Sequence, residues 1–325
     1  MIEELLASVQ VFSLPTRTNF RGINTREVAI IKGPNSYGEF SPFLEYDEVE
    51  SIPWLNSAIE AAYSELPALK LTEIEVNATL PEVTDEAAAR EILSWYPGCK
   101  TVKIKIGSNL EKDLARISWA KAANFENVRL DVNGAWTAIE AKRNLSEITN
   151  AFHIEYVEQP CSTIEELRAL ELDIPIVGDE ILRKARDPFA IDLTGAVDIL
   201  MLKVAPLGGI NRSMQLAEHH KLPVVVSSAF ESAVGITHGL KLASILNITK
   251  PAGLATGVLL KEDLGLHPIN DGFIKVSEII PNAISGINNL ARLDWWRERI
   301  RNTLDRKSTR LNSSHTDISR MPSSA

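Results

Sequence analysis

The apolar residues of this chain fall into short runs that alternate with longer amphipathic stretches. A run of β-branched or alternating apolar residues predicts a strand, and apolar residues that recur at every third or fourth position predict a helix. Strands are expected at residues 75–80, 102–106, 128–132, 154–157, 175–177, 199–202, 223–226 and 253–256. Helices are expected between them, for example at residues 85–96, 110–123, 137–149, 210–220 and 233–246.

Strands that alternate with helices in this way predict a parallel sheet that closes into a barrel, an α/β fold of the (β/α)7β TIM-like type, over residues 81–270. An open, doubly wound sheet is the alternative. The chain contains neither G-x-G-x-x-G at the start of a helix nor G-x-x-x-x-G-K-[ST]. Nucleotide-binding versions of the open fold therefore lack their usual phosphate-binding turn.

Residues 1–80 predict an α+β capping domain, with strands at 9–12 and 28–31 and a helix over 48–66. Two loops, at 14–22 and 37–43, carry arginines and aromatic residues. They are expected either to be lids over a pocket or to be anchored by Phe20, Phe40 and Phe43.

The barrel pattern stops near residue 270. A strand at 273–276 and a helix at 293–304 are expected to return to the capping domain, so that residues 271–305 belong to it. Residues 306–325 are rich in Ser, Thr, Asn and Arg and lack periodicity. They resemble translated cloning sequence and are predicted to be a non-native or disordered tail.

Composition narrows the classes of partner. A net charge of -9 without a concentrated basic run argues against nucleic acid and anionic membranes. The acidic start and the lack of a long apolar run predict a cytoplasmic protein. Two cysteines without a CxxC pair indicate neither a disulfide framework nor a zinc site. The sequence predicts no particular oligomeric state.

Five ionisable residues come at the ends of successive strands: Lys105, Asp131, Glu158, Asp179 and Lys203. The carboxyl ends of barrel strands meet at one mouth, where barrel enzymes carry out their chemistry. Three carboxylates that converge there repel one another unless a cation lies among them, and oxygen ligands favour Mg²⁺, with Mn²⁺ as a substitute. The two lysines more than offset the remaining charge. We therefore expect a small anionic carboxylate as the substrate.

Such a site suits removal of the proton next to a carboxylate, which gives an enediolate. A lysine with a lowered pKa is a suitable base. Lys103 and Lys105 lie two residues apart on a strand and so share one face, and each is expected to lower the pKa of the other. The alternative is a solvent-facing edge strand with two ordinary lysines.

The chain resembles the muconate-lactonizing-like group of the enolase superfamily over roughly residues 5–300. The motifs that carry the resemblance are Lys103-Ile104-Lys105, Asp131-Val132-Asn133, Glu158-Gln159-Pro160, Gly178-Asp179-Glu180 and Lys203 within residues 202–209. The resemblance implies that Lys105 is the base, that the three carboxylates bind Mg²⁺, and that Lys203 faces Lys105 across the substrate. A lysine on the sixth strand argues against the mandelate-racemase-like branch.

Residues 20–27, 38–43 and 226–232 are similar to those of members that dehydrate a succinyl-bearing cyclohexadiene carboxylate in menaquinone synthesis. This finer resemblance implies a lyase in which Lys105 removes the α-proton and returns it to the leaving hydroxyl. Lys203 would then act as a cation–π partner of the ring.

Other positions have less specific signals. Backbone N–H groups of Ser227 and Ser228 are expected to receive a second substrate carboxylate, with helix capping as the alternative. Arg21 and Lys103 are further candidates for binding the anion, and Asn133 for orienting the metal site. Glu180 is expected to point away from Asp179 by strand alternation.

Three rival functions remain open. An N-acylamino acid racemase or dipeptide epimerase would use the same two lysines, although residues 253–257 lack the Asp-x-Asp pattern usual in dipeptide epimerases. A Schiff-base aldolase would need no metal and would give the three carboxylates no role. A non-enzymatic binding protein would not need five ionisable groups at the barrel mouth.

Overall fold

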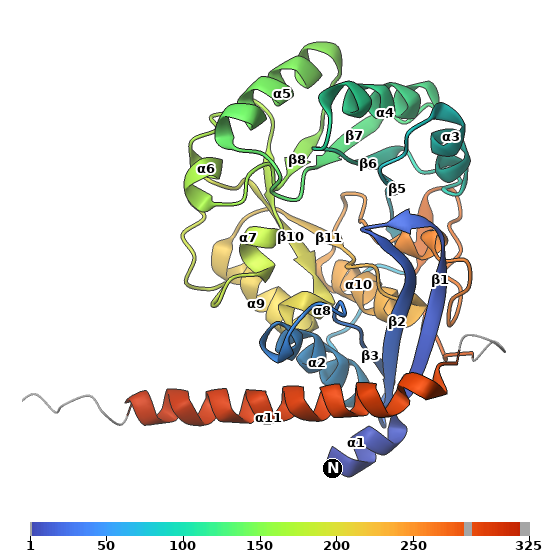
Figure 1. The fold of residues 1–325 in the computed structure, drawn as a ribbon, viewed down its shortest axis with the longest axis vertical. Helices are drawn as coiled ribbons and strands as arrows, with labels where there is room; N and C mark the ends of the chain where they lie inside the picture. The colour runs from blue at the N-terminus through green and yellow to red at the C-terminus, as the bar shows by residue number, and fades with distance from the viewer. Residues whose placement is uncertain (1, 283–287, 319–325) are drawn as a thin grey trace, which may run out of the picture.

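The computed structural model describes residues 2–282 and 288–318. It contains a curved sheet of parallel strands surrounded by helices (Figure 1). The seven strands are hydrogen-bonded in chain order: β5 (Ala78–Leu80), β6 (Thr101–Lys105), β7 (Asn127–Asp131), β8 (Tyr156–Glu158), β9 (Ile176–Gly178), β10 (Ile199–Lys203) and β11 (Val224–Ser227). This order confirms the TIM-like α/β fold.

The expected eighth strand at residues 253–256 is wrong in its bounds. Ala252 and Gly253 instead form single parallel bridges, to Val76 on one side and to Ser227 on the other. The closure is tight, because a Cβ atom on Gly253 would lie 2.3 Å from the Ser227 hydroxyl oxygen. The chain then turns into a 3-10 helix, η1 (Thr256–Leu259). Two residues thus close the barrel where a full strand was predicted.

Alternate residues of the strands enter different cores. Along β10, Leu200 and Leu202 pack into the large core beneath the helices. Ile199 and Met201 belong to a separate small cluster with Tyr156, Val177 and Val225. Since a strand has a period of two, Lys203 continues the second set and points inward, as a residue of the mouth must.

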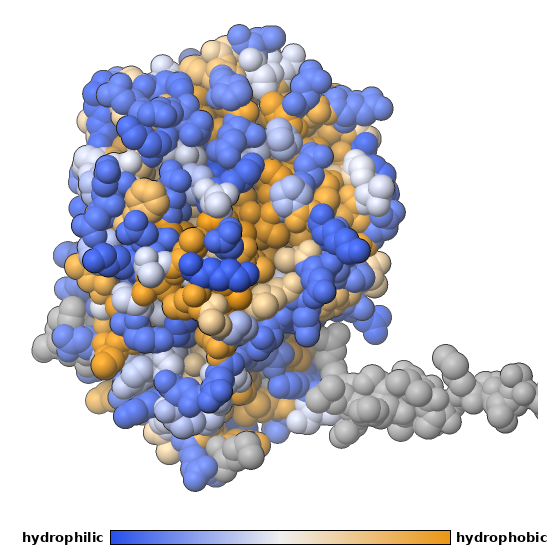
Figure 2. All heavy atoms as spheres, turned by 180° about the vertical axis from the view of Figure 1, so that it is seen from behind, coloured by the Kyte–Doolittle hydropathy of each residue, from blue (hydrophilic) through white to orange (hydrophobic). Residues whose placement is uncertain are grey.

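Eight helices connect the strands and their ends: α3 (Glu86–Ser94), α4 (Leu110–Ala122), α5 (Ala138–Ala151), α6 (Ile164–Arg168), α7 (Glu180–Arg183), α8 (Val204–Leu207), α9 (Ile210–His220) and α10 (Ala233–Leu246). The predictions for α9 and α10 are confirmed in their bounds. On the side opposite to that of Figure 1, hydrophilic residues cover most of the surface and apolar residues form a band across the middle (Figure 2).

The N-terminal region forms α1 (Ile2–Ser8), an antiparallel sheet of β1 (Gln10–Phe20), β2 (Ile23–Lys32) and β3 (Tyr37–Phe40), and α2 (Glu48–Tyr63). The two expected loops are therefore largely strand. The β1–β2 register shifts between Pro15 and Phe20, which hides the strand pattern in the sequence. The hairpin turns at Arg21 and Gly22, both with positive φ.

The C-terminal region only partly follows the prediction. Strand β12 (Phe273–Lys275) pairs with β4 (Glu73–Glu75) and not with the three-stranded sheet. Helix α11 (Leu293–Ile318) does reach the N-terminal region, because Trp296 is fully buried in a core that includes Trp54 of α2. The residues predicted to be a tail continue α11 to residue 318, and 319–325 lie outside the described residues. The domain boundaries stay predictions.

Two carboxylates of the N-terminal region cap barrel helices. Glu39 of β3 accepts hydrogen bonds from the backbone N–H groups of Ser232 (3.1 Å) and Gly235 (3.0 Å) at the start of α10. Glu60 of α2 accepts from Ile210 and Asn211 at the start of α9. The first N–H groups of a helix have no partner within it, so these carboxylates satisfy them and fasten the two regions together.

Within residues 2–282 and 288–318, no helix combines the length and the apolar character that a membrane crossing requires.

Candidate active site

The carboxyl ends of the strands bring the five ionisable residues to one mouth. Lys105, Asp131 and Glu158 are register partners at the ends of β6, β7 and β8. Lys203 ends β10, and Asp179 directly follows β9. The three carboxylates are at most 1% exposed. The predicted convergence at the mouth is therefore present.

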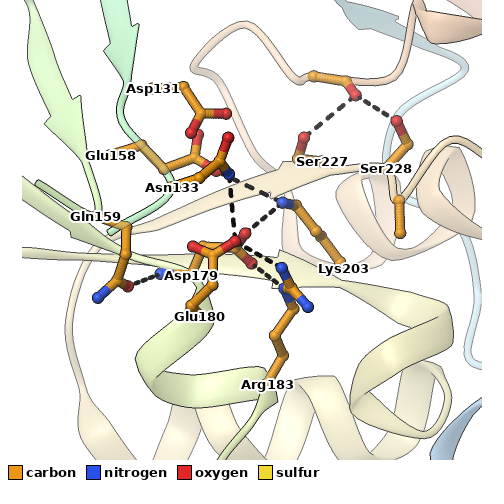
Figure 3. A network of polar contacts seen from close by, with 12 residues as sticks. Asp131, Asn133, Glu158, Gln159, Asp179, Glu180, Arg183, Lys203, Ser227 and Ser228 are labelled. Carbon is orange, nitrogen blue, oxygen red and sulfur yellow. Dashed lines mark hydrogen bonds and ion pairs between the residues drawn. The ribbon is translucent and has the colours of Figure 1, made fainter. Parts of the chain in front are cut away.

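Lysine ammonium groups lie among these carboxylates, and Figure 3 shows that of Lys203. The distances are 2.9 Å from Lys103 Nζ and 2.5 Å from Lys105 Nζ to the same oxygen of Asp131. Lys103 also contacts Glu158 at 2.7 Å. Lys203 Nζ lies 2.5 Å from Asp179 and 3.5 Å from Glu158. Each buried carboxylate thus has at least one ammonium partner.

The pKa directions follow from these contacts. Burial alone would raise the pKa of Asp131, but Lys103 and Lys105 lower it overall. Burial lowers the pKa of Lys105, and the positive charge of Lys103 adds to this, against the opposing effect of Asp131. For Lys103, burial acts downward, but Asp131 and Glu158 together raise its pKa well above the ordinary value. The expected mutual lowering is therefore right for Lys105 and wrong for Lys103, which faces two carboxylates.

The same reasoning applies to Asp179 and Lys203. Burial would raise the pKa of Asp179, but Lys203 and Arg183 lower it. Burial would lower the pKa of Lys203, but Asp179 and Glu158 raise it. Both groups are therefore held in their charged forms.

The donor set fits a hard divalent cation, although the carboxylates are not yet arranged around one. Among the described residues, no group of three or more His, Cys, Asp or Glu side chains is placed to hold a metal ion. One oxygen of Asp131 is buried and has no hydrogen-bond partner in the described part of the chain. A buried carboxylate oxygen without a partner is costly and is a ready ligand for a hard cation. A metal ion held by Glu158 and Asp179 would compete with the Lys203 ammonium, which contacts both carboxylates.

Asn133 connects Lys105 of the cluster to Glu180. Its side-chain oxygen accepts a hydrogen bond from Lys105 Nζ at 2.7 Å, and its Nδ2 donates to Glu180 at 3.2 Å. The expectation that Glu180 points away is wrong. Glu180 is the first residue of α7, so strand alternation ends before it, and its carboxylate lines the cavity at the mouth.

The sequence-based prediction missed Arg183 and Gln159. Arg183 donates to Asp179 (3.1 Å) and to Glu180 (2.6 Å), as Figure 3 shows. Its spacing of four and three residues from these acids was a helical signal that went unused. The Gln159 side-chain oxygen accepts from the backbone N–H groups of Asp179 (3.1 Å) and Ile181 (3.2 Å). Gln159 thereby fixes the chain at the start of α7.

A cavity of about 300 Å³ lies at the mouth. We call it the mouth cavity. Its lining includes Lys103, Asn133 and Lys203 from the barrel and Phe20, Arg21 and Phe43 from the N-terminal region. Both interpretations of the aromatic residues apply, since Phe20 and Phe43 line the cavity whereas Phe40 is buried against Trp296. A larger cavity of about 530 Å³ lies among Arg17, Trp95 and residues 254–267 and has none of the five strand-end residues in its lining.

Arg21 reaches the mouth cavity from the β1–β2 turn. Its guanidinium lies 3.9 Å from the centre of the Phe43 ring and donates to the Tyr46 hydroxyl at 3.4 Å. Its side chain is 41% exposed, so an anion in the cavity has access to it.

Ser227 and Ser228 line the mouth cavity, but the proposed use of the Ser228 N–H is wrong. That N–H donates to the carbonyl of Gly253 at 3.1 Å, and the following N–H, of Ala229, donates to Glu231. Capping does not explain the serines either, because the N-cap of α10 is Ser232. The Ser228 hydroxyl contacts Gly253 and Thr256, which braces the site where the barrel closes.

Residues 85–279 match the family described as "Enolase C-terminal domain-like", and residues 11–62 match "Enolase N-terminal domain-like". The o-succinylbenzoate synthase of Mycobacterium ulcerans (strain Agy99) is 41% identical over 312 residues, which span 92% of this chain and 94% of the relative. That of Mycobacterium leprae (strain TN) is 42% identical over 311 residues and 92% of each chain.

Solved structures show the same fold at lower identity. The L-Ala-D/L-Glu epimerase from Bacillus subtilis has a TM-score of 0.71 and 22% identity, over 86% of this chain and 98% of that chain. The muconate lactonizing enzyme from Pseudomonas putida has a TM-score of 0.67 and 19% identity, over 88% and 97%.

Proposed function

Since the chain belongs to the o-succinylbenzoate synthase family of the enolase superfamily, we propose that the mouth cavity is the site of that family's dehydration. The reaction removes water from 2-succinyl-6-hydroxy-2,4-cyclohexadiene-1-carboxylate and gives o-succinylbenzoate, an aromatic dicarboxylate. A carbon–oxygen lyase of this kind acts on a small carboxylate and depends on a divalent metal. The observation that carries the assignment is the identity of about 40% to curated synthases over 92% of the chain.

Lys105 is the proposed base. Its side chain is 21% exposed, against 8% for Lys103 and 9% for Lys203, so it is the lysine of this cluster with the most access to a substrate. Asp131 and Asn133 hold its ammonium beside the mouth cavity. In its neutral form Lys105 takes the proton from the carbon next to the carboxylate, and as an ammonium it returns that proton to the departing hydroxyl, which leaves as water.

Asp131, Glu158 and Asp179 are the proposed ligands of Mg²⁺, for which Mn²⁺ is a substitute. When bound, the ion stabilises the second negative charge that develops on the substrate carboxylate. Lys203 leaves its contact with Asp179 and places its charge beside the ring, opposite Lys105. Arg21 and Lys103 add positive charge to the cavity walls, and Asn133 keeps Lys105 oriented.

The test is turnover of the cyclohexadiene substrate, followed by absorbance, with and without Mg²⁺, on the wild type and on Lys105→Ala. We expect fast, metal-dependent aromatisation in the wild type. In Lys105→Ala we expect a loss of at least about 10³-fold in kcat, with Mg²⁺ binding retained in calorimetry. Lys100→Ala is the matched control, because Lys100 is exposed and pairs with Glu126. Retained turnover in Lys105→Ala would remove the assignment of the base.

Racemisation of N-acylamino acids is a second candidate on the same site. It is favoured by the separate attachment of the two lysines, because Lys105 is paired with Asp131 and Lys203 with Asp179, so each ammonium has its own carboxylate partner. Polarimetry with an N-succinylamino acid decides between dehydration and racemisation. Racemisation without aromatisation would keep the site and replace the reaction.

A further inference from the structure

A second cavity, of about 420 Å³, lies behind the active site, between α2 and residues 182–188. We call it the side groove. It shares Arg183 and Lys184 with the mouth cavity, but none of the five strand-end residues lines it. Its other walls come from α8 and α9 of the barrel. The two cavities therefore share part of their walls at Arg183 and Lys184.

The side groove carries unbalanced positive charge. Lys184, Arg186 and Arg212 line it, and none of the three has a carboxylate within ion-pair distance in the part of the chain that the structure describes. The Nε atom of Arg212 is buried without a hydrogen-bond partner there. One acid, Glu50, lines the groove, and its carboxylate already accepts from the N-cap of α2. Such a cluster is unexpected in a chain with a net charge of -9 and indicates a site for an anion.

The remaining lining is apolar and includes Pro53, Trp54 and Leu207. A groove of this size with apolar walls and a few polar groups has the character of a small-molecule site. The cations stand in two places, Lys184 and Arg186 after α7 and Arg212 on α9, so the groove suits an organic dianion whose two acid groups flank an apolar body. Arginine binds carboxylates in a bidentate manner, so Arg186 and Arg212 favour carboxylates as the two acid groups.

We propose that the side groove binds an aromatic dicarboxylate, of which the product of the reaction is one, and that this binding slows turnover. The inference rests on the proposed function, because that function supplies the ligand. Arg183 connects the two sites: it donates at 3.3 Å to the hydroxyl of Tyr46, which lines the groove, and it also donates to Asp179 and to Glu180, which lines the mouth cavity. An anion in the groove attracts the Arg183 guanidinium and weakens its hold on Asp179.

The experiment measures binding and inhibition by o-succinylbenzoate in the wild type and in the double variant Arg186→Ala/Arg212→Ala. Neither residue lines the mouth cavity. In the wild type we expect two molecules bound per chain in calorimetry, and inhibition that lowers kcat at least twofold at saturating substrate. In the double variant we expect one molecule bound, purely competitive inhibition and an unchanged kcat without product. Lys100→Ala/Lys250→Ala is the control for lost charge, since both lysines are exposed and lie outside the groove.

One bound molecule with purely competitive inhibition in the wild type would overturn the proposal. Two bound molecules in the double variant would also overturn it. The outcome is distinguishable from a failure of the proposed function, which would appear as absent turnover. Calorimetry with o-succinylbenzoate still counts the sites in that case.

Discussion

Two sets of carboxylates at the same end of the molecule are neutralised in different ways. Glu39 and Glu60 accept from backbone N–H groups at the starts of α10 and α9. Asp131 and Asp179 are paired instead with lysine ammonium groups. The first set is held by neutral donors, chiefly backbone N–H groups that cannot move away, with added bonds from short side chains such as Ser232. The second is held by charges on long, flexible side chains.

This difference separates structure from chemistry. A backbone N–H at a helix start is fixed, so a carboxylate there joins the capping sheet to the barrel permanently. A lysine ammonium can be exchanged for another cation, since its chain swings about several bonds. Asp131 and Asp179, which we call the mouth set, can therefore exchange their lysines for a metal ion and an anionic substrate. Glu39 and Glu60, which we call the interface set, cannot. Substitutions in each set should then separate activity from stability.

Among substitutions in these two sets of carboxylates, the largest effect is expected from Asp179→Asn, which keeps the shape of the ligand and removes its charge. We expect Mg²⁺ affinity, measured by calorimetry, to fall by at least about 10- to 100-fold, which is the usual loss when a residue that only supports a ligand is replaced, and kcat to fall with it. The hydrogen bond from Arg183 is still accepted by the amide oxygen, so the circular-dichroism spectrum should not change. Asp192→Asn is the control, because Asp192 is exposed and pairs with Arg168. Wild-type affinity in Asp179→Asn would mean that Asp179 is not a ligand.

The next largest effect is expected from Glu39→Ala, on stability. The substitution leaves the N–H groups of Ser232 and Gly235 and the Ser232 hydroxyl without their buried acceptor. We expect the free energy of unfolding to fall by about 2 to 4 kcal/mol, measured by urea titration. The kcat of the folded fraction should fall less than tenfold. A large loss of kcat at unchanged stability would contradict the separation of the two sets.

The sequence was sufficient for features that depend on local pattern. Helix α10 was predicted with its observed bounds because the signals that identify it, its apolar periodicity and the residues next to its two ends, are local in the sequence. The five ionisable residues were predicted to converge because the carboxyl ends of barrel strands always meet. The chemical roles of these residues stay predictions.

Features that depend on distant neighbours were not predictable. The closing strand is reduced to Ala252 and Gly253 because the bridges to Val76 and Ser227 are set by the curvature of the whole sheet. Glu180 was misplaced because β9 ends at Gly178 and Glu180 already belongs to α7, so strand alternation does not apply to it. The role of Arg183 depends on Tyr46, which is 137 residues away along the chain.

The smallest effect is expected from Glu231→Gln, in the pH dependence of stability. Burial raises the pKa of Glu231 to about 7, and the neighbouring Glu39 adds to the shift, against hydrogen bonds from backbone N–H groups and the charge of Arg26. A carboxyl group whose pKa is higher in the folded state favours folding below its ordinary pKa, and this contribution is lost as the pH rises to about 7. Asp263, whose burial raises its pKa to about 7, acts in the same direction.

The wild type should therefore lose stability between about pH 4.5 and 7. Above about pH 7, Glu231 and Asp263 should cause little further change. Glutamine does not ionise and can still accept from the Ala229 N–H, so in Glu231→Gln the loss should be smaller by about 1 to 3 kcal/mol. Urea unfolding at pH 5, 6, 7 and 8 measures this loss of stability. Glu126→Gln is the control, because Glu126 is exposed, and its stability should change with pH as that of the wild type does. The part of the slope that remains in Glu231→Gln is assigned to Asp263. An identical slope in the two proteins would show that Glu231 is ionised in the folded state throughout this range, held by Arg26 and the Ala229 N–H. The contact between the N-terminal region and the start of α10 would then contain one more fixed negative charge than its geometry indicates.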